Sequence, residues 1–206
     1  MRMRRICAGA ALLACLAAPS HADGTLPELS PEELIELAKS TYRGESCWWE
    51  RVEEDLGEIR SWEISFRYDY EEEDGPDRAV RLYQLPCFYG AYNFSSIWFM
   101  ETEIDGLGPV HFATPELDID YADDESAVVE NLTVLGFTAV SSLVNAWYDE
   151  DTQTISSFSK WRGIADAASS GTWTFHDGRF VLTEYQADAS YDGEINPVTV
   201  YKATRP

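Results

Sequence analysis

The sequence predicts a mainly β domain, built as an antiparallel sandwich or a strongly curved sheet, with one α-helix at its N-terminal end. Three observations support this fold class. Only the segment after Ser30 combines the capping signals and the apolar spacing of a confident helix. From Trp62 onward, apolar and polar residues alternate with a period of two in several short runs. Acidic or glycine-containing segments separate these runs, as turns between strands do.

The first 22 residues are expected to be a secretory signal peptide. Three arginines near the start precede an apolar stretch from Ile6 to Ala18. This stretch is too short to span a bilayer, which takes about 20 apolar residues. Ser20-His21-Ala22 then places small residues where signal peptidase reads them, so we expect the exported form to begin at Asp23.

Lipidation at Cys15 is an alternative processing route. Leu12-Leu13-Ala14-Cys15 resembles the lipobox of bacterial lipoproteins, in which Cys15 becomes the first, lipid-bearing residue. Against this alternative, Leu13 stands where a small residue is usual, and the apolar run continues past Cys15. Ordinary cleavage after Ala22 is therefore favoured.

Residues 23–206 are expected to form a single acidic domain. This part of the chain has 12 basic against 37 acidic residues, a net charge of −25. Such a surface repels phosphate groups, so nucleic acid is excluded as a partner. No later stretch is long and apolar enough to be a transmembrane segment. The partner is expected to be an unidentified ligand or protein of the cell envelope.

The helix is predicted to begin at Pro31 and to end before Gly44. Ser30 and Glu33 have the spacing of a capping box, and proline suits the first helical position. Alternating residues from Trp62 to Tyr70 predict the first strand, and the acidic segment from Glu71 to Asp77 predicts a solvated hairpin tip.

Further strands follow from the same alternation. We expect a second strand around Leu82, a third from Tyr92 to Met100, and a fourth around Val110 and Phe112. The acidic stretch from Glu116 to Glu130 is weakly patterned and is expected to be an exposed loop. Residues 132–140 are expected to be a strand, and a last strand is expected around Val198, Val200 and Tyr201.

The sharpest local prediction is a hairpin at His176-Asp177-Gly178-Arg179. Asp-Gly supplies the positive φ values of a type I′ turn. Such a turn pairs Phe175 with Phe180 and Trp173 with Leu182 on one face of the sheet.

Two cysteines, Cys47 and Cys87, follow the predicted signal peptide. A pair of cysteines in an exported protein is typical of one disulfide bond. A metal site is the weaker interpretation, because two isolated thiols without a nearby histidine do not make a zinc-binding set.

Two blocks of this sequence resemble a family of bacterial exported proteins. The first is Pro86–Asn93, and the second runs from Val144 to Phe180. The second block includes Val144-Asn145, Tyr148-Asp149, Ile155–Phe158, Lys160–Gly163, Trp173 and Gly178–Phe180. Through these residues, about the last 120 positions resemble the family catalogued as domain of unknown function 1176. The resemblance implies no activity, because the family has none established.

The chain departs from the family where members carry two cysteines. One family cysteine follows the Arg-Gly of the second block, and another lies beyond the final hairpin. Here these positions read Ile164–Ala168 and Ala187–Ser190. If the two family cysteines pair with each other, both ends of that bridge are absent together.

The sequence assigns no catalytic residues, and no cofactor or metal site is expected. His111 and His176 are interpreted as ordinary strand or loop residues. No Gly-x-Ser-x-Gly nucleophile motif occurs, and the abundant acids form too many chance pairs to single out a glycosidase pair. The acidic run from Asp118 to Glu125 suggests calcium, but it is not an EF-hand, so a solvated loop is favoured.

A binding role is predicted for the segment that contains Trp147, Tyr148, Lys160, Trp161 and Arg162. It combines aromatic rings with two bases on a very acidic chain, and aromatic and arginine side chains dominate binding hot spots. Trp147 and Trp161 are expected in loops and therefore exposed. The alternative is that Trp161 is buried and Arg162 forms an internal ion pair.

The function expected from the sequence is that of a periplasmic or secreted protein that binds a ligand or partner without catalysis. The alternative is an envelope hydrolase that uses carboxylates.

Overall fold

The computed structural model describes residues 26, 28–42, 47–54, 58–72, 74–75, 77–122 and 128–204. The predicted signal peptide lies outside the described residues, as do Cys15, Ala22 and Asp23. The described part contains two helices and twelve strands. The helices are α1 (Pro31–Thr41) and α2 (Trp49–Glu54). The strands are β1 (Arg60–Phe66), β2 (Arg78–Tyr89), β3 (Phe94–Thr102), β4 (Gly106–Pro109), β5 (Phe112–Tyr121), β6 (Val129–Val140), β7 (Ser142–Val144), β8 (Trp147–Asp149), β9 (Thr154–Lys160), β10 (Ala168–His176), β11 (Arg179–Asp188) and β12 (Val198–Lys202).

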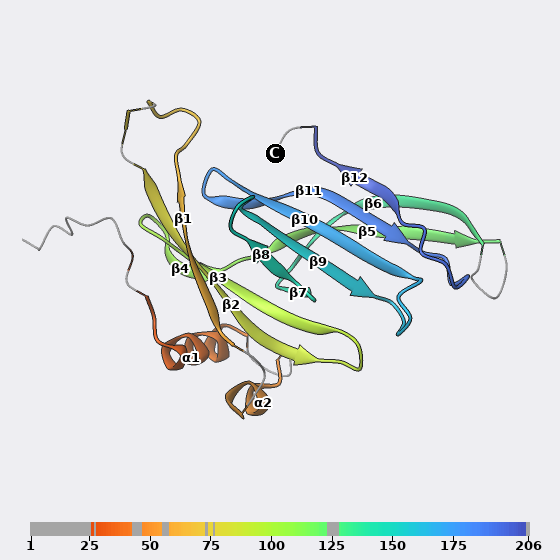
Figure 1. Cartoon of the computed structure of the whole chain (residues 1–206), viewed down its shortest axis with the longest axis horizontal. Helices are drawn as coiled ribbons and strands as arrows, with labels where there is room; N and C mark the ends of the chain where they lie inside the picture. Colours follow the sequence, from red (N-terminus) through yellow and green to blue (C-terminus); the bar gives the residue numbers. More distant parts are fainter. Residues whose placement is uncertain are drawn as a thin grey trace, which may run out of the picture.

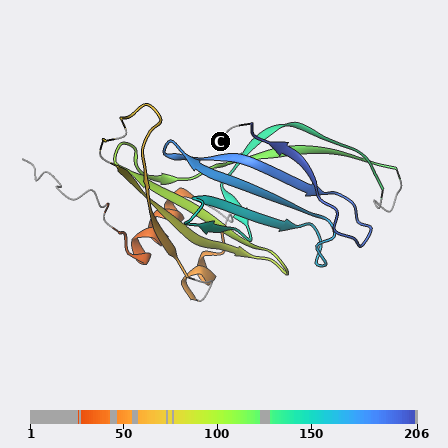
Figure 2. The same cartoon turned by 45° about the horizontal axis from the view of Figure 1, so that its top comes forward.

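The strands form two five-stranded sheets and one long ribbon, all antiparallel (Figures 1 and 2). The first sheet has the order β1-β2-β3-β4, and β7 pairs with β3 beside β4. The second sheet has the order β12-β11-β10-β9-β8, and β5 pairs only with β6 in the two-stranded ribbon. The predicted class is confirmed: the chain is mainly β, the strands are antiparallel, and a helix lies at the N-terminal end.

Helix α1 begins as the sequence predicts. The Glu33 amide donates to Ser30 Oγ, and the Glu33 carboxylate accepts from the Ser30 amide, which completes the capping box. Leu34 and Ala38 are buried against the first sheet. The helix ends at Thr41, and Gly44, the predicted stop, lies outside the described residues.

Alternation along the first sheet creates two separate cores. In β2, Leu82 faces the second sheet, whereas Leu85 faces α1. Trp98 on β3 joins the core between the sheets, together with Trp173 and Leu182 from the second sheet. The first sheet is therefore the middle layer, with α1 on one face and the second sheet on the other (Figure 1).

The predicted disulfide is confirmed, since Cys47 and Cys87 are bonded. It joins the segment before α2 to the end of β2, on the helix-facing side of the first sheet. The Trp48 amide also donates to the Cys87 carbonyl at 2.8 Å, so a covalent bond and a backbone hydrogen bond fix the same place.

The C-terminal hairpin is confirmed in its register. Asp177 and Gly178 have φ values of 48° and 78°, as a type I′ turn requires. Phe175 pairs with Phe180, and Trp173 pairs with Leu182. All four of the paired side chains are buried in the core between the sheets.

The expected loop from Glu116 to Glu130 is wrong over most of its length. Strand β5 continues to Tyr121 and β6 begins at Val129, so the described ends of this stretch are strands. In β5 the acids face solvent while Leu117 and Ile119 lie on the partly buried side. The outward acids obscured a period-two pattern. Asp123, Asp124 and Glu125 of the calcium hypothesis lie outside the described residues.

Four smaller boundaries also differ from the expectation. β1 ends before Tyr68, and β3 begins after Tyr92. Val110 lies between β4 and β5, while Trp147 belongs to the short strand β8 rather than to a loop. Strand ends carry aromatic residues of the same type as strand interiors, so alternation alone does not mark these boundaries.

The helices among the described residues are both short. Neither has the length and apolarity that a membrane-spanning helix needs.

Candidate functional site

Asn93, in the turn after β2, and Asn145, in the segment after β7, contact each other and β9. The Asn93 amide group donates to the Lys160 carbonyl at 2.8 Å, and Asn93 Oδ1 accepts from the Lys160 amide at 3.2 Å. Asn145 Nδ2 donates to Asn93 Oδ1 at 3.0 Å and to the Phe158 carbonyl at 2.9 Å. We call this pair the asparagine junction.

Asn145 suits its position for conformational reasons as well. Its φ is 45°, in the left-handed region that asparagine tolerates better than most residues. Its backbone amide donates to the Phe94 carbonyl, and its side-chain oxygen accepts from the Phe94 amide at 2.9 Å. One side chain thus holds β3 and β9 together and places Lys160 beside the β2–β3 turn.

A groove of about 460 Å³ lies next to the asparagine junction. The residues that line it include Phe88, Tyr92, Ser95, Ser142 and Val144. Among the described residues, no hydrogen-bond partner is found for the hydroxyl groups of Ser95 and Ser142. The groove therefore combines apolar surface with serine hydroxyl groups.

Exposed aromatic rings border this groove. Tyr92 is 43% exposed and lines the groove, and Trp48 is 43% exposed and packs on Phe88 with ring centroids 4.3 Å apart. The disulfide and the Trp48 backbone hydrogen bond hold Trp48 beside Phe88. We call Trp48, Phe88 and Tyr92, with the groove beside them, the aromatic groove.

Lys160 and Trp161 lie beside the aromatic groove. The Tyr92 hydroxyl donates to the Trp161 carbonyl at 3.3 Å, which connects the β2–β3 turn to the β9–β10 turn. Trp161 is half-buried, and its indole Nε1 donates to Ser169 Oγ at 3.3 Å. Among the described residues, no ion-pair partner of Lys160 is found. Its ammonium group therefore adds positive charge to this edge.

Arg162 has a different role in the same turn. Its guanidinium donates two hydrogen bonds to Asp166, whose side chain is almost fully buried, and one to the Tyr191 carbonyl. It also lies over the Tyr191 ring, 5.3 Å from the centroid. The hydrogen bonds from Arg162 lower the pKa of Asp166 to about 2. Arg162 thus forms the ion pair of the alternative interpretation, but its own side chain is 39% exposed and Trp161 is only half-buried.

Trp147 and Tyr148 lie farther along the same sheet. Trp147 pairs with Ser156, four residues before Lys160, which at the rise of a strand is about 13 Å away. Trp147 is 50% exposed, as expected. Tyr148 packs against Trp62, and burial raises its pKa to about 12. The structure thus groups Lys160, Trp161 and Arg162 in one turn and places the other two predicted residues apart from them.

The sequence reasoning missed Trp48, Phe88 and Tyr92. Their signal was present: aromatic residues surround Gly90 in a turn, and the predicted disulfide brings Trp48 to Phe88. Aromatic residues also favour strands, so their presence alone does not distinguish a binding surface from packing within a sheet.

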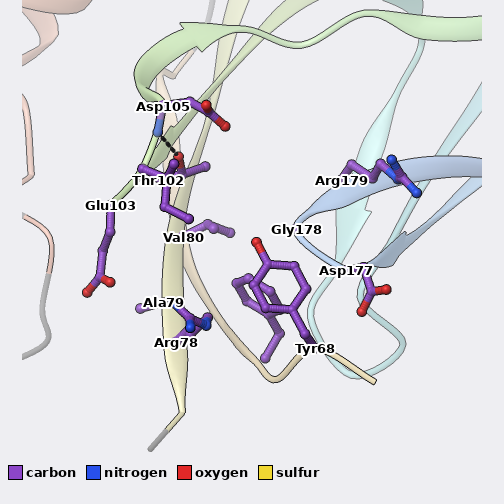
Figure 3. A pocket seen from close by; sticks show the side chains of 12 residues that line it. Tyr68, Arg78, Ala79, Val80, Thr102, Glu103, Asp105, Asp177, Gly178 and Arg179 are labelled. Atoms are coloured by element: carbon purple, nitrogen blue, oxygen red, sulfur yellow. Dashed lines mark hydrogen bonds between the residues drawn. The ribbon is translucent and has the colours of Figure 1, made fainter. Parts of the chain in front are cut away.

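A second pocket, of about 240 Å³, lies between the open ends of the two sheets (Figure 3). The Tyr68 ring lies between β2 and the β10–β11 turn, and Glu103 and Asp105 come from the β3–β4 turn (Figure 3). The Asp105 amide donates to Thr102 Oγ1 at 2.8 Å. Asp177 and Arg179 belong to the opposite rim (Figure 3). Charged groups of both signs therefore surround this pocket.

Residues 77–197 match the family described as Protein of unknown function (DUF1176). The chain belongs to the DUF1176 family. This agrees with the resemblance found in the sequence, and the matched part runs from the start of β2 to the residue before β12. No curated protein and no solved structure matches the chain.

The DUF1176 match includes the asparagine junction and most of the aromatic groove. Asn93 and Asn145 belong to the two separate resemblance blocks, and their hydrogen bond shows that the blocks meet in space. Trp48 and Cys47 precede the matched region. The aromatic groove therefore combines Trp48, from the segment before β2, with residues that lie inside the matched region.

The two segments at which the resemblance implies family cysteines, Ile164–Ala168 and Ala187–Ser190, lie side by side, since Ala168 pairs with Asp188. Buried carboxylates occupy this region instead. Asp166 accepts from the Gly193 amide at 2.9 Å, and Asp188 accepts from the Ser190 amide at 3.1 Å. Hydrogen bonds to these two carboxylates hold the segment that follows β11.

Proposed function

We propose that this protein is exported to the periplasm or secreted, and that it binds an envelope glycan in the aromatic groove without turning it over. The aromatic groove is the observation that carries this proposal. Phe88 and Tyr92 supply ring surface, and Ser95 and Ser142 supply hydroxyl groups. Sugar rings present apolar C–H faces and polar hydroxyl edges. A groove with both kinds of surface complements them.

Export is supported by two features. The first is the disulfide between Cys47 and Cys87, because such bonds persist in oxidising compartments. The second is the predicted signal peptide, with its basic start, short apolar stretch and small-residue cleavage pattern.

The charge of the protein narrows the ligand class. A net charge of −22 over the whole chain repels polyanions, so a neutral saccharide is favoured over nucleic acid or an anionic polymer. Lys160 and Trp161 flank the groove, and Arg162 fixes the turn that carries them.

The alternative function is hydrolysis by carboxylates. Its acids would come from the pocket in Figure 3, whose lining includes Glu103, Asp105 and Asp177. Hydrolysis by carboxylates needs two acids at a defined separation that flank the same bond. Glu103 and Asp177 lie on opposite sides of this pocket, with the Tyr68 ring between them (Figure 3), whereas the aromatic groove gathers rings and hydroxyl groups in one place. We therefore favour binding.

Fluorescence titration with chitotetraose, a neutral oligosaccharide of N-acetylglucosamine, tests the proposal. Trp48 borders the groove, so binding should change the tryptophan emission. We expect Tyr92→Ala to weaken binding at least about tenfold, the loss of one ring contact of roughly 1.4 kcal/mol.

Phe137→Ala is the matched control, because Phe137 is an exposed ring on the β5–β6 ribbon and does not line the groove. It should bind like the unaltered protein. Equal losses in both variants, or binding of an envelope peptide in place of the saccharide, would contradict the glycan proposal. Release of new reducing ends from the saccharide would favour the hydrolase.

A further inference from the structure

Three side chains from two different sheets converge beside the pocket of Figure 3. They are Asp69, His176 and Asp177, and one potential ligand atom from each lies within 4.8 Å of the other two. His176 ends β10 and Asp177 begins the turn that follows, whereas Asp69 follows β1 in the other sheet. No local sequence pattern connects them, because 108 positions separate Asp69 from Asp177.

Packing holds the two hairpins together at this place. The rings of Phe66 and Phe175 meet edge to face with centroids 5.3 Å apart. Gly178 lies close under Tyr68 and Phe66, so that a Cβ there would contact both rings. The relative position of the two hairpins is therefore set by the core and not only by the three polar side chains.

Hydrogen bonding also orients the carboxylates. The Asp69 amide donates to Asp177 Oδ1 at 3.3 Å, which leaves the second oxygen of Asp177 available. That oxygen, Oδ2, lies 3.8 Å from His176 Nε2. His176 and Asp177 are both half-buried, so solvent screens their interactions less than at an open surface.

An imidazole with two carboxylates is a donor set suited to a first-row divalent metal ion. Ligand atoms about 2.1 Å from a tetrahedral ion lie roughly 3.4 Å from one another. The present separations are at most 4.8 Å, so side-chain rotations that shorten them by up to about 1.4 Å are enough to reach this geometry. Calcium fits less well, because it takes six to eight oxygen ligands and this set includes a nitrogen.

We propose that Asp69, His176 and Asp177 bind a divalent transition metal ion, with zinc as the reference ion. The ion would cross-link the segment after β1 to the β10–β11 turn and leave a coordination position open beside the pocket. This site is distinct from the aromatic groove and does not depend on the glycan proposal. It would give His176 a role beyond that of the ordinary strand or loop residue expected from the sequence.

Isothermal titration calorimetry of the tag-free, chelator-treated protein with zinc chloride tests the proposal. We expect one saturable site, and a rise in Tm of about 5 to 10 °C when zinc is at 100 times its Kd. His176→Ala, Asp177→Asn and Asp69→Asn should each weaken zinc binding at least about tenfold. Asn at position 177 is chosen because it tolerates the positive φ there.

Two matched controls separate this site from general attraction of cations to an acidic chain. His111→Ala removes an exposed histidine elsewhere, and Asp151→Asn removes an exposed carboxylate from another turn. Both should bind zinc as the unaltered protein does. Thermal melting of each variant without metal shows whether that variant folds. If His176→Ala or Asp177→Asn is destabilised, zinc binding by Asp69→Asn, which changes an exposed side chain, decides whether the site exists.

Three outcomes would overturn the metal site. They are no saturable zinc binding below about 1 mM, equal binding by His176→Ala and the unaltered protein, and calcium binding as tight as zinc binding that survives the loss of His176. The last outcome would indicate that carboxylates bind the cation without His176.

Discussion

In the first sheet, the end of β2 is fixed by the Cys47–Cys87 disulfide, whereas the loops around β10 and β11 in the second sheet are fixed by hydrogen bonds to buried carboxylates. Asp166 and Asp188 are 1% and 4% exposed and accept bonds from segments that follow them in the chain. A disulfide resists acid but yields to reductant, and a buried carboxylate does the opposite. The two regions should therefore fail under different conditions.

The largest effect should come from the disulfide. Its cysteines are 40 positions apart, for which the chain-entropy model gives roughly 4 kcal/mol of stabilisation. We expect the double variant Cys47→Ser/Cys87→Ser to lose about 10 °C in Tm by differential scanning calorimetry. Reductant should lower the Tm of the unaltered protein by a similar amount and leave the double variant unchanged. Two titratable thiols in the native oxidised protein would show the assignment to be wrong.

A smaller effect is expected at the asparagine junction, which belongs to both regions. Asn145→Ala removes hydrogen bonds to Asn93, Phe158 and Phe94 and places alanine at a positive φ. We expect a loss of about 2 to 3 kcal/mol in the free energy of unfolding, measured in urea. Asn196→Ala is the control, since that exposed side chain makes only one long hydrogen bond. Equal losses of unfolding free energy in the two variants would contradict a special role of the asparagine junction in stability.

The smallest expected effect is the acid sensitivity of the second sheet. The pKa of Asp166 is about 2 in the folded protein, below its ordinary value of 3.8, because Arg162 stabilises the carboxylate. The unfolded chain therefore takes up the proton more readily, and protonation favours unfolding. The contribution of Asp166 is complete above about pH 5 and is lost as the pH falls through 3.8 towards 2. Solvent screens the partly exposed Arg162, which keeps this effect below that of the disulfide.

Thermal melts between pH 5 and pH 2 measure this contribution. Asp166→Asn should flatten the fall in Tm over that window, and Asp151→Asn, at an exposed turn, should leave it unchanged. Reduction of the disulfide should shift the whole curve without changing its slope. An identical slope in Asp166→Asn would mean that other carboxylates cause the acid sensitivity.

Local signals in the sequence predicted the elements that depend on neighbouring residues. Ser30 and Glu33 marked the start of α1. Asp177-Gly178 predicted the register between β10, a strand of nine residues, and β11. The disulfide followed from counting cysteines. The helix start and the hairpin turn each depend on a few neighbouring residues. The disulfide was predictable because only two cysteines follow the predicted signal peptide.

Features that depend on distant segments were not predictable in the same way. The hydrogen bond between Asn93 and Asn145 spans 52 positions, and no local pattern around either residue predicts that the two side chains meet. The grouping of Asp69 with His176 also depends on how two sheets stack. β5 was missed for a different reason, since outward acids resemble loop composition although they obey the alternation of a strand.

Those outward acids have a consequence for how copies of this protein meet. The β5–β6 ribbon is paired only within itself, so each of its strands has an edge that no strand covers among the described residues. An uncovered edge is a template for pairing with another molecule and for aggregation. Glu116, Asp118 and Asp120 stand exposed along β5. Two copies that approach through this edge bring like charges together, so the acidity of the chain opposes edge-to-edge association.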